Sequence, residues 1–161
     1  MTDFAILAPV PPLEHLETGQ AIAEQTGFVA FGSRKFELFR EVDRRRQEEL
    51  VPILIYPSRE EDPAKASYQV SWIGWYIGSE ESQNGRHSAG MEHRPPSTGD
   101  YQSDNRGYWA VFWHVRHLVQ LPPANRFLIS RLQTVKGGWR KNAPPHGPEL
   151  VAVPDFIDFP E

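Results

Sequence analysis

The sequence predicts a mixed α/β fold (α+β), with about five to six strands and two or three short helices. The 15 prolines and 12 glycines break long helices and favour short strands joined by loops. Several apolar segments have the length of strands and are rich in aromatic and β-branched residues. A length of 161 residues suits one core, so we expect residues 1–161 to form a single domain with its core at about 4–153.

The first half of the chain predicts two strands and two helices. Residues 4–10, FAILAPV, have the composition of a strand, and the prolines after them end it. Apolar spacing predicts a short amphipathic helix from Leu13 to Gly27 and a brief strand at residues 28–31. Ser33 stands where an N-cap is expected, ahead of the clearest helix, at about 34–49.

The middle of the chain predicts the centre of the sheet. Residues 51–58, VPILIYPS, show no polar alternation, which indicates a strand buried on both faces. Residues 68–78, YQVSWIGWYIG, are typical of a strand whose period of two places Trp72 and Tyr76 on one face, on either side of Gly74.

The second half begins with a long polar insertion, residues 79–107, which is either functional, closing over a ligand, or disordered. Residues 108–121, YWAVFWHVRHLVQL, resume the strand pattern and are expected to pair with residues 68–78. Residues 149–153 are expected to form the last strand.

Composition excludes several classes of protein. The absence of cysteine removes thiol catalysis, cysteine zinc sites and disulfides, and it fits a reducing compartment. The N-terminal apolar run is short and is preceded by an aspartate and no basic residue, so it does not fit a signal peptide or a membrane anchor. We therefore expect a cytoplasmic protein with no membrane span.

The histidines do not suggest a metal site, and no motif suggests a cofactor. His114 and His117 are three residues apart, which on a strand turns them to opposite faces. His87 and His93 lie in the long loop, where solvated side chains are expected. Phosphate-binding, dinucleotide-binding, zinc-protease and nucleophile-elbow motifs are all missing. The sequence thus predicts neither metal nor cofactor, and it favours a protein that binds without catalysing.

The charge pattern suggests an anionic partner. The net charge of −4 argues against strong non-specific phosphate binding. Residues 105–148, however, carry seven basic and no acidic side chains. Within this stretch Trp139, Arg140 and Lys141 combine an indole with two cations, a pattern suited to gripping a base and its phosphate. The alternative is a solvated surface with an uneven charge distribution.

The aromatic strands have two interpretations. Aromatic side chains form platforms on which bases stack, and the same side chains dominate hydrophobic cores. Trp75 has isoleucines on both sides along its face, which is typical of a core. Trp72 and Tyr76 flank Gly74, and the missing side chain there suits close approach by a ligand. We therefore predict that Trp72 and Tyr76 contact the ligand.

Several segments follow one another in a distinctive order: a strand and a helix, then PILIYPS, VSWIGWYIG, YWAVFWHV and PPHGPELVAV. This order resembles the PUA-like superfamily, particularly its EVE and ASCH branches, over about residues 4–153. The insertion at 79–107 departs from the pattern. The resemblance implies a pseudo-barrel with a concave aromatic pocket for a flipped or modified base of RNA or DNA. It places these residues at the pocket border: Ser33, Arg34, Tyr56, Ser58, Trp72 and Tyr76.

The leading hypothesis is therefore a binding module for nucleic acid or a nucleotide. Two alternatives stay open. One is an enzyme acting on RNA or a modified nucleoside, as the resemblance to ASCH-like hydrolases suggests. The other is a protein-interaction domain, since exposed aromatic patches also mark interfaces with other chains.

Overall fold

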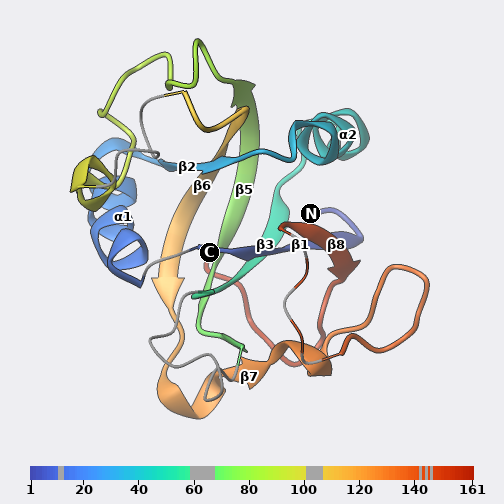
Figure 1. Ribbon diagram of the computed structural model, residues 1–161. Helices are drawn as coiled ribbons and strands as arrows, with labels where there is room; N and C mark the ends of the chain where they lie inside the picture. Colours follow the sequence, from blue (N-terminus) through green and yellow to red (C-terminus); the bar gives the residue numbers. More distant parts are fainter. Residues whose placement is uncertain (11–12, 59–67, 101–106, 142, 144, 146) are drawn as a thin grey trace.

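The computed structural model describes residues 1–10, 13–58, 68–100, 107–141, 143, 145 and 147–161. Two α-helices are present in this part of the chain, α1 (Leu13–Thr26) and α2 (Phe36–Arg46) (Figure 1). The strands of the main sheet are β1 (Phe4–Pro9), β2 (Val29–Ser33), β3 (Val51–Tyr56), β5 (Trp72–Glu81), β6 (Val111–Gln120) and β8 (Glu149–Ala152). A small ribbon is formed by β4 (Gln69–Val70) and β7 (Phe127–Leu128). Short 3-10 turns lie at Pro96–Asp100, Pro123–Asn125 and Ile129–Arg131.

The main sheet has the strand order β2-β6-β5-β3-β1-β8. The β1–β3 pair is parallel and the other pairs are antiparallel, including the predicted pairing of β5 with β6. The mixed α/β class is thereby confirmed. The sheet in the described residues is not closed into a barrel, so the pseudo-barrel that the resemblance implied is not what these strands form.

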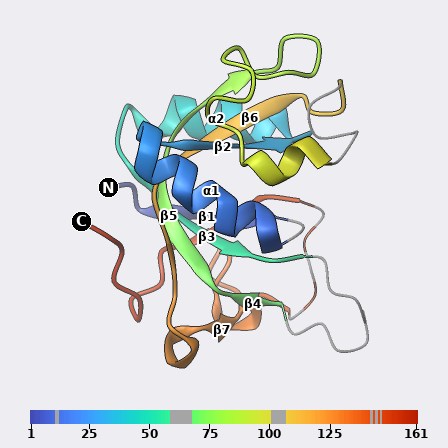
Figure 2. The same ribbon diagram turned by 90° about the vertical axis from the view of Figure 1, so that its left-hand side faces the viewer.

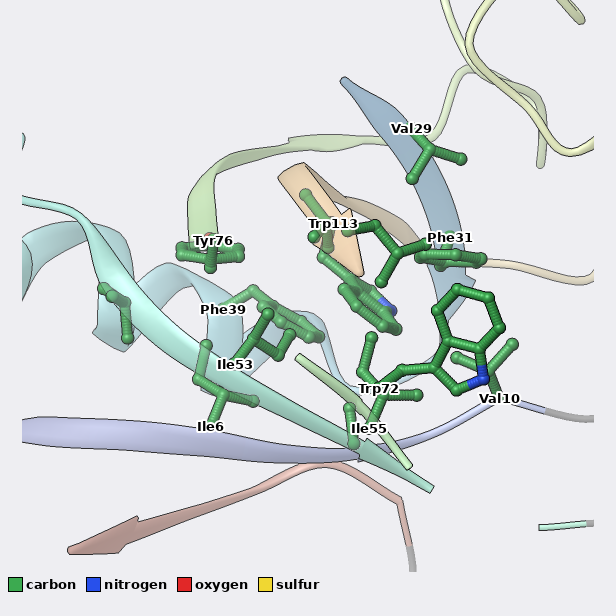
Figure 3. Packing of buried hydrophobic residues seen from close by; sticks show 14 of the residues in the cluster. Ile6, Val10, Val29, Phe31, Phe39, Ile53, Ile55, Trp72, Tyr76 and Trp113 are labelled. Atoms are coloured by element: carbon green, nitrogen blue, oxygen red, sulfur yellow. The ribbon is translucent and has the colours of Figure 1, made fainter. Parts of the chain in front are cut away.

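Both faces of the sheet are buried. Side chains of β1 alternate between two hydrophobic clusters, with Ile6 in one and Leu7 in the other. The first cluster, part of which is drawn in Figure 3, includes Leu16 of α1 and Phe39 of α2. The second lies against the β4–β7 ribbon, which Figure 2 shows at the end of the sheet away from α2. Because a hydrophobic cluster covers each face of the sheet, the central strands are apolar along their whole length.

The helices follow their predicted positions, but α2 is shorter than predicted at both ends and stops at Arg46, where Gln47 is left-handed (φ 47°). α1 ends one residue before the positive-φ Gly27, as expected. α2 begins later than predicted, because Ser33 is still the last residue of β2 and Lys35 occupies the N-cap. The Ser33 hydroxyl instead accepts a hydrogen bond from the backbone amide of Lys35 (3.1 Å). It therefore shapes the link between β2 and α2.

The polar insertion starts later than predicted, because β5 continues to Glu81. Its residues 82–100 and 107 have a described conformation, and residues 101–106 lie outside the described part. Residues 93 and 94 run along the outer edge of β2, where Ala30 donates its amide to the carbonyl of His93 (2.7 Å). Arg94 returns a hydrogen bond from Nη1 to the Ala30 carbonyl (2.7 Å). The described part of the insertion is thus tied to the sheet.

Among the described residues, no helix combines the length and apolar character needed to cross a membrane.

Candidate ligand-binding pocket

Three of the predicted site residues, Ser33, Arg34 and Ser58, line one pocket of about 290 Å³. Five segments of the chain meet there: the end of β1, the end of β2, the residues after β3, the entry to β6 and the entry to β8. The other described lining residues are Pro9, Gly32, Lys35, Tyr108, Trp109, Trp113, Gly147 and Pro148. The volume lies near the lower end of the roughly 300–1,000 Å³ typical of small-molecule sites.

Trp109 lies directly against the backbone of Gly32. A Cβ atom on Gly32 would come within 2.4 Å of Cδ1 and Cγ of the indole. The Tyr108 ring meets Trp109 edge to face, with ring centres 4.6 Å apart. The guanidinium of Arg34 lies 5.2 Å from the centre of the Tyr108 ring, within the range of a cation–π interaction. Aromatic and cationic groups are therefore interleaved at this pocket.

Trp113 closes the inner side of the pocket. It is 1% exposed and its ring lies between those of Phe31 and Phe39 (Figure 3). Its indole nitrogen, Nε1, has no hydrogen-bond acceptor among the described residues. A buried N–H without an acceptor costs about 1–3 kcal/mol. The nitrogen is fully enclosed by its neighbours, so this cost is borne by the fold.

A smaller hollow of about 30 Å³ shares Trp109, Trp113 and Gly32 with the pocket. The buried Arg94 lines this inner hollow, with its guanidinium 5.0 Å from the centre of the Phe112 ring. Such a volume accepts no more than a water molecule or one small substituent.

The charge of the pocket is positive. Arg34 and Lys35 line it, and none of the lining residues that the structure describes is acidic. The Lys35 side chain runs along Gly147, where an added Cβ would come within 3.1 Å of Cε. The aliphatic part of Lys35 is thus packed against Gly147, although the residue as a whole is exposed.

Comparison with known proteins does not assign this pocket. No family model, curated protein or solved structure matches this chain. The resemblance of its sequence pattern to the PUA-like superfamily accordingly stays a prediction. Any functional conclusion must come from the chemistry of the residues themselves.

Trp72 and Tyr76 do not line the pocket, contrary to the prediction. They are 1% and 0% exposed and belong to the core between the sheet and the helices (Figure 3). The gap expected at Gly74 is filled by the neighbouring strand, because an added Cβ would lie 2.8 Å from Cγ1 of Val115. Tyr76 donates its hydroxyl proton to Oδ1 of Asp43 (2.6 Å). These two rings therefore stabilise the fold.

The other predicted residues lie elsewhere. Tyr56 is fully buried in the second cluster, where burial raises the pKa of its phenol. Trp139 is 68% exposed and lines a separate hollow of about 540 Å³, which shares no lining residue with the pocket. Arg140 is paired with Glu149, which neutralises its charge, and Lys141 is exposed. The predicted grip of Trp139, Arg140 and Lys141 is therefore not part of the pocket.

Sequence reasoning missed a second cluster of titratable side chains. Nε2 of His87 lies 3.1 Å from Nε2 of His114, and it also contacts Oε1 of Glu80. His87 is 6% exposed, so the expectation of a solvated loop histidine is wrong. Burial, and then the proximity of His87, lower the pKa of His114 to about 4, although Glu80 opposes this shift. Burial also lowers the pKa of His87, so both imidazoles are favoured in the neutral form.

Proposed function

We propose that this protein binds a nucleotide, or a single base of a nucleic acid, in the pocket of Trp109. The observation that carries the proposal is the lining of the pocket: indole and phenol rings, two cations and two serine hydroxyls, with no acidic group among the described residues. Aromatic faces stack on bases of any sequence, and arginine and lysine bind phosphate.

The size of the pocket favours one base. A volume of about 290 Å³ holds a single planar ring system and leaves the sugar and phosphate at the rim. Arg34 and Lys35 lie at the start of α2, close to Ser33 and Ser58, which supply hydroxyl groups for a phosphate or a sugar.

The charge of the pocket and of the whole chain suits a ligand with few phosphate groups. Two cations line the pocket, and the net charge of −4 is unlike that of a strongly basic, non-specific nucleic-acid binder. If Arg34 and Lys35 each neutralise one phosphate of a single strand, the logarithm of the association constant falls with the logarithm of salt concentration with a slope of about −1.4.

The test is a titration of the full chain with mononucleotides and short single-stranded oligonucleotides, unmodified and base-modified, at two ionic strengths. We expect saturable binding that Trp109→Ala weakens by roughly 5- to 150-fold, the equivalent of about 1–3 kcal/mol of stacking. Changing both Arg34 and Lys35 to alanine should flatten the salt dependence.

Matched controls are available on other surfaces. Trp139→Ala removes an exposed indole from the separate hollow, and Arg44→Ala removes an exposed cation of α2. Neither should alter binding. The proposal fails if no ligand binds at low salt, or if Trp139→Ala weakens binding as much as Trp109→Ala does. A change in the mass of a bound nucleoside or RNA would show turnover and support the enzyme alternative instead of a binding module. Capture of a protein at this surface without nucleotide binding would favour the protein-interaction domain.

A further inference from the structure

A second site lies on the opposite face of β6 from Trp113. It consists of Glu80 near the end of β5, His87 in the insertion and His114 on β6. We propose that these three side chains bind one divalent transition-metal ion, with Zn²⁺ as the metal of choice. This inference does not depend on the proposed nucleotide binding.

The three ligand atoms converge on one point. The two imidazole Nε2 atoms are 3.1 Å apart, and one nitrogen from each ring and one Glu80 oxygen all lie within 4.8 Å of one another. Oε1 of Glu80 contacts Nε2 of His87 and lies 3.9 Å from Nε2 of His114. In tetrahedral zinc sites, ligand nitrogens about 2.0–2.1 Å from the metal are about 3.3–3.4 Å from each other. Small shifts of the side chains would therefore admit the ion.

The hydrogen-bonding pattern explains why a cation suits this point. The Ala89 amide donates to Nδ1 of His87 (3.1 Å), so a neutral His87 carries its proton on Nε2. That single hydrogen faces both Oε1 of Glu80 and Nε2 of His114, so a straight hydrogen bond to one atom leaves at most a bent, weaker one to the other. A metal ion instead accepts a lone pair from each of the three atoms.

Metal binding then has a local consequence at Ala89. With the metal on Nε2, the proton of a neutral His87 ring moves to Nδ1, which faces the Ala89 amide. Two donors cannot face each other, so the Ala89 hydrogen bond must break. This change is a signature of metal binding through His87 in particular.

The surroundings orient the ligands. Oε2 of Glu80 accepts a hydrogen bond from the Ser88 hydroxyl (2.7 Å), which leaves Oε1 directed at the histidines. The Phe28 ring packs against the imidazole of His114, with ring centres 4.6 Å apart. Partners of this kind hold metal ligands in place in known sites.

The ligand set selects the metal. Two imidazoles and one carboxylate suit zinc and its neighbours in the first transition row, whereas calcium and magnesium prefer oxygen ligands only. The side chains of Glu80 and His114 are 25% and 17% exposed, so water can occupy a fourth position. Because the ligands come from β5, the insertion and β6, the ion would fasten the insertion to the sheet.

The test uses the full chain, treated with a chelator and then titrated with Zn²⁺ by calorimetry. We expect one ion per chain and a rise in melting temperature of about 5–10 °C when free zinc is roughly 100 times the dissociation constant. Co²⁺ in place of Zn²⁺ should give the visible absorption of a four-coordinate site. The amide resonance of Ala89 should shift on zinc addition.

Variants locate the ion. Glu80→Gln and His114→Gln should each weaken zinc binding by more than about 100-fold, since the loss of outer-shell partners alone costs about 10- to 100-fold. Ser88→Ala should weaken it by about 10-fold. His117→Asn is the matched control, because His117 is an exposed histidine of β6 outside the cluster.

The proposal is overturned if the chelator-treated protein binds no zinc saturably, or if Glu80→Gln and His114→Gln bind it as tightly as the unaltered chain. It is also overturned if His117→Asn loses zinc to the same extent. Circular dichroism in chelator shows whether each variant is folded, and Glu80→Gln, which keeps the side-chain shape, is the variant expected to fold normally.

Discussion

The substitution Gly32→Ala distinguishes an effect on ligand binding at the pocket from an effect on the stability of the fold. An alanine Cβ at this position would lie 2.4 Å from two atoms of the Trp109 indole. Carbon atoms in contact are about 3.5–4.0 Å apart, so the ring must retreat by more than about 1 Å. The indole would then leave the position at which it lines the pocket. If it stacks on a base, we expect nucleotide affinity to fall by roughly 5- to 150-fold.

A double-mutant cycle tests this reasoning. Nucleotide affinity is measured for the unaltered chain, Gly32→Ala, Trp109→Ala and the double variant. Gly32→Ala should have almost no further effect once Trp109 is alanine, because the colliding ring is gone. An equal loss of affinity from Gly32→Ala in both backgrounds would refute the proposed contact. The melting temperature is recorded in parallel. It should fall by about 2–12 °C, the decrease that corresponds to about 1–3 kcal/mol of destabilisation by overpacking.

Three further predictions concern the core. Trp72→Ala should lower the free energy of unfolding by about 3–5 kcal/mol, measured by urea denaturation, because the ring is buried; unchanged stability would contradict its place in the core. Asp43→Ala should cost about 1–3 kcal/mol in the same assay, because it removes the acceptor of hydrogen bonds from Tyr76 and Ser79 (both 2.6 Å). Burial raises the pKa of Tyr56 and Tyr76 above the ordinary value of about 10, so the unfolded chain ionises first. The contribution of these two phenols to the free energy of unfolding is therefore complete below about pH 10 and is lost as the pH rises further. In Tyr76→Phe, the free energy of unfolding should fall less steeply over this alkaline range.

The sequence predicted which strand residues share a face, but not which face holds the ligand. The period of two correctly grouped Trp72 with Tyr76 and set Trp75 opposite them. Trp75, however, is covered by the C-terminal residues, donating from Nε1 to the carbonyl of Pro160 (2.6 Å) and packing on Phe159. With both faces of the strand buried, alternation alone carries no information about exposure.

The pocket was predicted in part. Ser33, Arg34 and Ser58 lie at or just beyond strand ends, and the resemblance to the PUA-like superfamily implied that all three border one pocket. Tyr108 and Trp109 were assigned to the start of an aromatic strand, whereas β6 begins only at Val111. The position of the Trp109 indole against Gly32 depends on packing between distant segments, which a local sequence pattern does not predict.

The cluster of Glu80, His87 and His114 was missed for a related reason. Strand pairing sets Glu80 opposite Phe112 and Gly78 opposite His114, so two of the three ligands follow from the β5–β6 register. His87 comes from the insertion, and its position depends on how that segment folds back over the sheet. Spacing between histidines along the chain says nothing about such a contact.

The position of β1 between β3 and β8 has a consequence for synthesis of the protein. β1 is made first, yet one of its two neighbours consists of residues 149–152. Until those residues leave the ribosome, one edge of an apolar strand has no partner, and such an edge is prone to pair with another chain. A nascent or truncated chain that ends before residue 149 should therefore aggregate more readily than the full sheet, and chaperones that cover exposed strands should bind it during that interval.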